Sequence, residues 1–121
     1  MVLECNKRKV GGWYEKIAAN YLRENGLQIK VMNYRCKLGE IDLIARDGDE
    51  LVFVEVKYRS SGANGEATES VGYGKRKTIS RVAKFYLMTH YHTVDLCCRF
   101  DVIGINGNRI KWLKNAFEYT E

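Results

Sequence analysis

Three acidic side chains and one lysine occur as two pairs with a spacing of two residues, Glu40 with Asp42 and Glu55 with Lys57. On neighbouring strands, carboxylates facing each other at about 5 Å would repel by about 3 kcal/mol at an effective dielectric constant of about 20. Mg²⁺ or Mn²⁺ would offset this repulsion, because these ions favour one or two carboxylates together with water and phosphate oxygens. A lysine beside the cation can stabilise a phosphoryl transition state. The residue types therefore predict metal-dependent phosphoryl chemistry.

A β-hairpin is predicted to position these four side chains. The runs EIDLIAR and LVFVEVKYR alternate in β-forming residues, and the DGDE linker between them contains Asp-Gly, a frequent hairpin turn. A turn of two or of four residues gives the same register, which places Asp42 opposite Glu55. It also places Glu40 opposite Lys57. Because side chains two apart on a strand share a face, all four are expected to project from one side of the hairpin.

The alternative is a solvated charged face, with Glu40 and Lys57 forming a weak surface ion pair. Two observations favour the metal site over this alternative. Ile44 and Phe53 fall on the same face as the charges, so that face is not purely polar. The opposite face is apolar throughout and consists of Ile41, Leu43, Ala45, Val52, Val54 and Val56. A hairpin covered on both faces is typical of a layered α/β domain, where unpaired charges are costly.

An Asp on one strand followed by Glu-x-Lys on the next resembles the signature of the PD-(D/E)xK nucleases. The stretch GEIDLIARDGDELVFVEVKYRS is similar to that of the YraN-like family of small predicted endonucleases, distant relatives of the archaeal Holliday-junction resolvases. The likeness includes the GGWYEKIAANYLRENG helix, the NYR before the hairpin, Lys75 after it and the late RFDVIGI strand. It covers about residues 11–118.

The resemblance implies an α/β, restriction-endonuclease-like fold with a mixed β-sheet flanked by helices. It also implies that Asp42 and Glu55 are metal ligands and that Lys57 is the catalytic lysine. The first helix would supply a further acid, Glu15, which could otherwise be an ordinary first-turn glutamate favoured by the helix dipole. Small relatives act as dimers, so the resemblance implies a homodimer.

The resulting hypothesis is an endonuclease that hydrolyses phosphodiester bonds in nucleic acid, with DNA, including branched or structured DNA, as the expected substrate. Mg²⁺ or Mn²⁺ would be bound by Asp42, Glu55 and the backbone carbonyl of Val56, with Glu15 or Glu40 completing the acidic shell through water. A nuclease fold that binds nucleic acid without cutting it remains an alternative. An adaptor for an acidic protein is disfavoured, because an acidic partner would not suit the clustered carboxylates.

The net charge of +5 and the pI near 9.0 permit binding to nucleic acid. Positive charge gathers at NKRK, residues 6–9, and at GKRK, residues 74–77. The residues expected to contact nucleic acid are Lys75, Arg76, Lys77 and Arg81. Either cluster alone could be a solvated basic surface, but together with an acidic site they fit a polyanionic substrate cut at a metal.

The chain of 121 residues is expected to form one nuclease-like domain, with a core at about 11–118 and a basic N-terminal arm at 1–10. Gly11 and Gly12 are predicted to open a first helix at 13–25, before a strand at 27–35. Beyond the hairpin, the SSGANGE run predicts a loop, followed by a helix at 74–89. A strand at 99–105, an NGN turn and a RIKWL strand end the chain. No signal peptide or membrane span is evident and the cysteines show no zinc spacing, so a cytoplasmic protein with reduced thiols is expected.

Overall fold

The computed structural model describes the backbone of residues 3–59 and 71–121, and the side chains within those ranges from residue 12 onwards. Two helices and five strands follow one another as α1 (Leu3–Glu24), β1 (Gln28–Cys36), β2 (Gly39–Asp47), β3 (Glu50–Arg59), α2 (Tyr73–Tyr91), β4 (Cys98–Asn106) and β5 (Arg109–Phe117). The strands form one sheet in the order β1-β2-β3-β4-β5, in which only β3 and β4 pair in parallel. The predicted mixed-sheet α/β fold is confirmed, and it is consistent with a restriction-endonuclease-like architecture.

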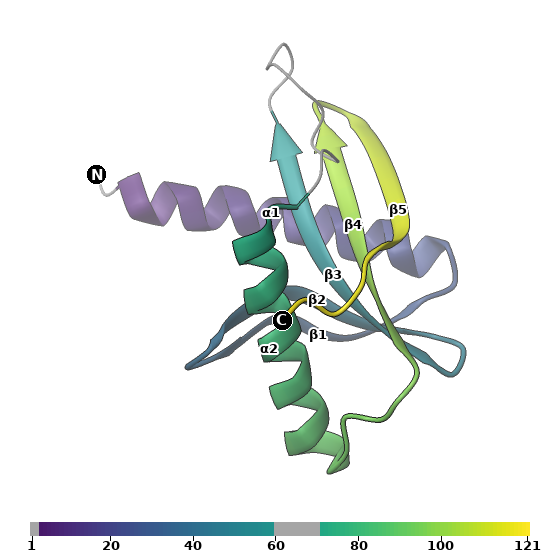
Figure 1. Ribbon diagram of the computed structural model, residues 1–121. Helices are drawn as coiled ribbons and strands as arrows, with labels where there is room; N and C mark the ends of the chain where they lie inside the picture. Colours follow the sequence, from purple (N-terminus) through teal and green to yellow (C-terminus); the bar gives the residue numbers. More distant parts are fainter. Residues whose placement is uncertain (1–2, 60–70) are drawn as a thin grey trace.

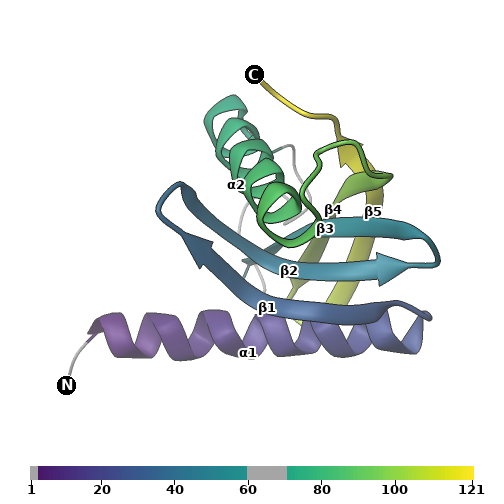
Figure 2. The ribbon, with the colours of Figure 1, turned by 90° about the horizontal axis from the view of Figure 1, so that it is seen from below.

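The two helices cover opposite faces of the sheet (Figure 2). On the α1 side, the buried Ala18, Ala19 and Leu22 pack against Leu43 and Val54. On the α2 side, a second apolar cluster joins the helix to the sheet and includes Ile44, Phe53, Ile79, Val82 and Phe100. The alternating hairpin strands are therefore buried on both faces, as their sequence predicted. Among the described residues, neither helix is long and apolar enough to cross a membrane.

The predicted hairpin register is confirmed from Asp47–Glu50 as far as Leu43–Val54. Beyond that pair β2 no longer pairs with β3, and Figure 1 shows the two strands running apart. The expected backbone pairings of Asp42 with Glu55 and of Glu40 with Lys57 are therefore both wrong. Glu40 instead pairs with Arg35 on β1, where its carboxylate lies 3.2 Å from the guanidinium.

The first helix starts at Leu3, well before the predicted start at Trp13. Gly11 and Gly12 thus lie inside α1 and do not open it, which a long helix tolerates at a cost of up to about 1 kcal/mol for each glycine. The first turns of α1 include residues 3–10, which were expected to form an arm. The side chains of the NKRK cluster and the whole SSGANGE run lie outside the described residues.

The remaining elements match their predictions with small extensions. The helix expected at 74–89 is α2, and the strand expected at 99–105 is β4. The last strand, β5, continues four residues beyond RIKWL and ends at Phe117. The register between β4 and β5 shifts between Phe100 and Val102, so that Phe117 pairs with Phe100. The cysteines whose side chains are described are free thiols, as expected.

A glycine allows α2 to lie close to the start of β2. Gly39 has φ +146°, and a Cβ atom at this position would meet Thr78 Cγ2 at 2.6 Å and Val82 Cγ2 at 3.3 Å. Both the backbone conformation and the close approach therefore require glycine. This contact places the first turns of α2, including Lys75, beside the point where β2 and β3 separate.

We predict opposite effects for alanine at two glycines. Gly39→Ala should lower the free energy of unfolding by about 1–3 kcal/mol, because it combines backbone strain with overpacking against α2. Gly12→Ala should be neutral or raise it by up to about 1 kcal/mol, because a Cβ there meets nothing within 4 Å and alanine favours the helix. Urea denaturation of both variants measures this difference, and equal stability would contradict the close packing at Gly39.

Candidate active site

Asp42 lies at the point where β2 leaves β3. Its Oδ2 atom accepts a hydrogen bond of 2.8 Å from the backbone N–H of Val56 on β3. The last residues of β2 and β3 that pair with each other are Leu43 and Val54. Beyond this pair, the Asp42 carboxylate accepts the hydrogen bond that a backbone carbonyl of β2 would otherwise accept. The Asp42 side chain is held against β3 even though the two backbones diverge.

Glu55 meets Asp42 from β3. The side chain of Glu55 is only 12% exposed, and its carboxyl group lies near that of Asp42. Burial, with the Asp42 charge as the next cause, raises the pKa of Glu55 to about 8. Lys75 at the start of α2 approaches the outer oxygen of Glu55, with 3.6 Å between Nζ and Oε2. The side chains of Asp42 and Glu55 thus lie close together although their backbones are not paired, and Lys75 approaches Glu55 from α2.

Glu15 reaches the same acidic group from α1. Burial, followed by the nearby charges of Asp42 and Glu40, raises the pKa of Glu15 to about 7. The fully buried Ala18 and Ala19 bring this helix close to the sheet. Glu15, Asp42 and Glu55 thus form a continuous chain of carboxylates from three different elements.

The remaining predicted site residues surround this chain of carboxylates. Lys57 is half-buried and, by strand alternation, shares a face of β3 with Glu55. Glu40 lies at the rim, in its exposed ion pair with Arg35. Val56, the proposed carbonyl ligand, is tied to the site through its N–H bond to Asp42.

The four cations expected to bind nucleic acid all lie in the first half of α2, and they have different surroundings. Lys75 joins the acidic group, as described above. The Arg76 guanidinium donates a hydrogen bond to the Val71 carbonyl, and Lys77 lies 5.9 Å from the centre of the Tyr73 ring. Arg81 is exposed. The helix therefore presents positive charge from the acidic site outwards.

The arrangement of the carboxylates fits a hard divalent cation. Oxygens of neighbouring carboxyl groups can lie within hydrogen-bond distance only if a proton or a cation stands between them. Within the described ranges, no three acidic, histidine or cysteine side chains form a group that could hold a metal ion. Mg²⁺ and Mn²⁺ can use one or two carboxylates and complete their coordination with water and substrate.

A second acidic cluster was not identified from the sequence. Asp101 on β4 is fully buried and accepts hydrogen bonds from Arg99 and from the indole N–H of Trp112. Arg99 also binds Asp47 and Glu50, at the two ends of the hairpin turn. Because Arg99 on β4 contacts all three acids, the cluster ties β4 to the hairpin. The spacing of two residues between Arg99 and Asp101 could have predicted this ion pair, because it places both side chains on one face of the strand.

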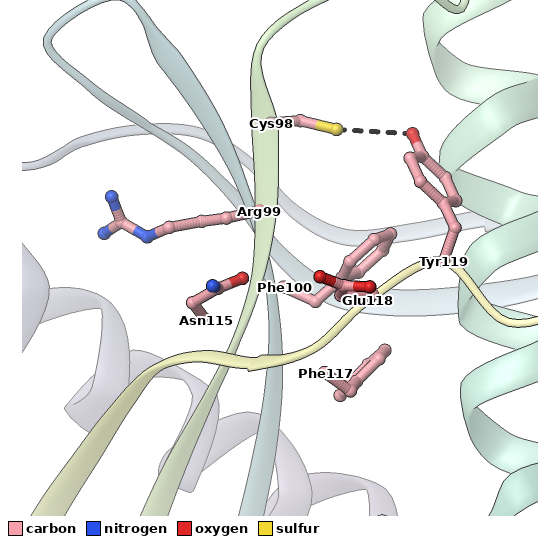
Figure 3. A pocket seen from close by; sticks show the side chains of 7 residues that line it. All are labelled: Cys98, Arg99, Phe100, Asn115, Phe117, Glu118 and Tyr119. Atoms are coloured by element: carbon pink, nitrogen blue, oxygen red, sulfur yellow. Dashed lines mark hydrogen bonds between the residues drawn. The ribbon is translucent and has the colours of Figure 1, made fainter.

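A pocket of about 310 Å³ lies between the start of β4 and the end of β5. It is lined by Cys98, Phe100 and Tyr119, among others, and Figure 3 shows the hydrogen bond between Cys98 Sγ and the Tyr119 hydroxyl at its edge. None of the acidic site residues lines this pocket. The candidate site is therefore defined by its charged groups and not by this cavity.

Comparison with known proteins finds one family over most of the chain. The model described as "Uncharacterised protein family UPF0102" matches residues 14–105. A UPF0102 protein of Lachnoclostridium phytofermentans is 45% identical over 113 residues, which cover 93% of this chain and 96% of the relative. One from Legionella pneumophila is 46% identical over 110 residues, covering 89% and 93%, and one from Vibrio cholerae is 44% identical over 116 residues, covering 92% and 93%. The names of these relatives state no activity.

The raised pKa of Glu55 predicts a pH dependence of stability. The folded protein binds the Glu55 proton more tightly than the unfolded chain, whose glutamates have a pKa of 4.5. The free energy of unfolding should therefore fall as the pH rises from 4.5 towards about 8, and Glu15 should contribute in the same direction up to about 7. Glu55→Gln should make this dependence less steep.

Urea denaturation at several pH values in EDTA measures this effect. Asp49→Asn is the matched control, because Asp49 is an exposed carboxylate in the hairpin turn. A Glu55→Gln variant with the same pH dependence as the wild type would contradict the assignment of the shifted proton to this site.

Proposed function

The chain belongs to the uncharacterised protein family UPF0102, and from the geometry of its acidic site we propose that it is a metal-dependent endonuclease of the PD-(D/E)xK type that hydrolyses DNA. One observation carries the proposal. Asp42, held by the Val56 N–H, lies near the carboxyl group of Glu55 where two strands diverge, and Lys57 follows Glu55 on the same face of β3. Two acids can bind a divalent cation and a lysine can stabilise charge that develops on the phosphate, which together support metal-assisted phosphodiester hydrolysis.

The metal ligands in this proposal are Asp42, Glu55 and the carbonyl of Val56, with Glu15 adding a carboxylate through water. Mg²⁺ or Mn²⁺, when bound, would supply positive charge that balances these acids and polarises the scissile phosphate. The protein holds Asp42 in place through the Val56 N–H and holds Glu55 by burial, so the ligand oxygens are oriented before a cation arrives. This preorganisation supports the proposal.

The two lysines have different roles in the proposal. Lys57 orients the attacking water or stabilises the negative charge that develops on the phosphate. Lys75, already 3.6 Å from Glu55, supplies a cation at the entrance to the acidic group and can contact a phosphate of the bound strand. The exposed Arg81 and the neighbouring Lys77 extend this positive surface along α2. A basic surface that leads to an acidic site supports a polyanionic substrate.

A cleavage assay tests this function directly. Labelled four-way junction, flap, duplex and single-stranded DNA are incubated with the protein, with Mn²⁺ or with EDTA. We predict cleavage only with Mn²⁺, and a loss of about 10²–10³-fold in rate for Lys57→Ala, the usual effect of removing one group that stabilises transition-state charge. Lys114→Ala is the control, because Lys114 lies on β5 over the Trp112 ring.

Binding to DNA without cleavage of any substrate in this panel would favour a non-catalytic binding module. Cleavage that persists in EDTA, or that Lys57→Ala leaves unchanged, would contradict the proposed site.

The metal site also predicts a change in stability that needs no substrate. In EDTA at a pH above 8, Asp42→Asn should raise the melting temperature, because it removes one charge from the carboxylate pair and keeps an oxygen that can accept from the Val56 N–H. With free Mn²⁺ at ten times its Kd, the wild type should gain about 1.4 kcal/mol, whereas the variant should gain less.

Thermal melts of both proteins and of Asp49→Asn, each with EDTA and with Mn²⁺, provide the measurement. Equal responses to Mn²⁺ in all three proteins would rule out a metal site at Asp42.

A further inference from the structure

A short acidic segment, residues 118–121, follows β5 and returns to α2 (Figure 1). The ring of Tyr119 packs edge-on against Phe100, with 5.0 Å between the ring centroids. Beyond this ring, the Thr120 N–H donates a hydrogen bond of 2.9 Å to the hydroxyl of the buried Ser80 on α2. The acidic segment is therefore anchored at Tyr119 and continues onto the surface of the helix.

Glu121 lies among hydrogen-bond donors of α2. Its carbonyl oxygen accepts a hydrogen bond from the Tyr73 hydroxyl, and its carboxylate lies 3.5 Å from Lys84 Nζ. Lys77 Nζ lies 5.9 Å from the centre of the Tyr73 ring. Tyr73, Lys77 and Lys84 follow one another at intervals of four and seven residues, so they form one stripe along the helix, the donor stripe. An acidic residue of the chain itself thus occupies this donor stripe.

The charge of α2 suits an anion longer than one glutamate. The helix carries five lysines and arginines and no acidic residue, and only Lys84 among its cations forms an ion pair with Glu121 in the described part of the chain. Carboxylates and phosphodiesters accept hydrogen bonds from the same ammonium and hydroxyl donors. A chain of phosphates would use the donor stripe and the neighbouring cations together, which a single carboxylate cannot do.

The contact of Glu121 with the helix is weak enough to be displaced. The side chain of Glu121 is 88% exposed, and that of Lys84 is 42% exposed. An ion pair in water contributes little, because solvent screens both charges. Nucleic acid gains in addition from the counterions that its phosphates release on binding. Residues 120 and 121 can leave the helix while Tyr119 stays packed on Phe100.

We propose that the donor stripe binds phosphate groups of nucleic acid and that Glu121 competes with them, so that the acidic segment lowers the affinity for nucleic acid until it is displaced. The choice of DNA as the nucleic acid rests on the proposed function, whereas the competition needs no cleavage. An acidic segment of another protein is the other occupant to consider. The cations of α2 outside the contact with Glu121, among them Arg76 and Arg81, favour a long polyanion over such a segment.

Binding of a fluorescently labelled blunt DNA duplex in EDTA tests the competition without cleavage. Glu121→Gln should raise the affinity by about two- to fivefold, the range that an exposed ion pair supplies. Glu118→Gln is the matched control, because it removes the same charge from the same segment. The exposed Glu118 lines the pocket between β4 and β5 (Figure 3) and should therefore give a smaller gain. Equal gains in the two variants, or no gain in Glu121→Gln, would overturn the proposal.

The salt dependence of the same binding tests the donor stripe. Lys84→Ala should weaken duplex binding and reduce the slope of log K against log salt by about 1, the effect of losing one phosphate contact. Lys114→Ala should leave the slope unchanged, because Lys114 lies over the Trp112 ring on β5. In the Lys84→Ala background, Glu121→Gln should give a smaller gain than in the wild type, since the ion pair is already absent. Independent effects of the two changes would contradict competition at Lys84.

NMR spectra of the ¹⁵N-labelled protein report the displacement directly. The Thr120 amide is hydrogen-bonded to Ser80, so its signal and that of Glu121 should move towards unfolded positions when the duplex is added. The signal of Ile103, in the centre of the sheet, should keep its folded position. Duplex binding that leaves Thr120 and Glu121 unchanged would place the nucleic acid elsewhere and overturn the proposal. Displacement by polyglutamate and not by the duplex would assign the donor stripe to an acidic protein and also overturn it.

These measurements separate the competition from the nuclease function. Tighter duplex binding by Glu121→Gln without cleavage of any substrate would support the competition and remove the nuclease function. Cleavage with Mn²⁺, together with equal duplex affinities of Glu121→Gln and the wild type, would overturn the competition while the nuclease function stands. The absence of duplex binding in both the wild type and Glu121→Gln would overturn the proposal.

Discussion

The arrangement of the acidic site depends on one hydrogen bond, from the Val56 N–H to the Asp42 carboxylate. An antiparallel pair normally satisfies such donors with backbone carbonyls, but β2 stops pairing with β3 at Leu43–Val54. The side chain of Asp42 satisfies this donor and is fixed against β3 while its backbone moves away. The Asp42 carboxylate is therefore oriented at the point where the two strands separate.

The acidic site stores electrostatic repulsion, and the rest of the domain must hold it together. The raised pKa values of Glu15 and Glu55 reflect the cost of burying a charge first and the repulsion from Asp42 second. Both faces of the hairpin are packed in apolar clusters, and the Arg99–Asp101 cluster ties its turn to β4. The packed clusters on both faces and the Arg99 ion pairs therefore hold the strands that carry the acids.

The two helices deliver different groups to the same place. The buried Ala18 and Ala19 let α1 approach the sheet closely enough for Glu15 to reach Asp42. On the other face, Gly39 lets α2 contact β2, so that Lys75 meets Glu55. The aromatic pair Tyr14–Tyr58 belongs to the same α1 contact. Small residues at the helix–sheet interfaces therefore determine which charged side chains reach the acids.

Local sequence determined the hairpin, its register near the turn and the presence of Asp42, Glu55 and Lys57 on neighbouring strands, because alternation and turn chemistry act over a few residues. It did not determine where α1 begins, since two glycines interrupt the helical pattern without ending the helix. Only the tertiary structure decided that β2 separates from β3, which pairs Glu40 with Arg35 and not with Lys57. The same holds for the contacts of Glu15, Lys75 and the Tyr14–Tyr58 stack. These contacts join elements distant in sequence, and they depend on how closely each helix packs against the sheet.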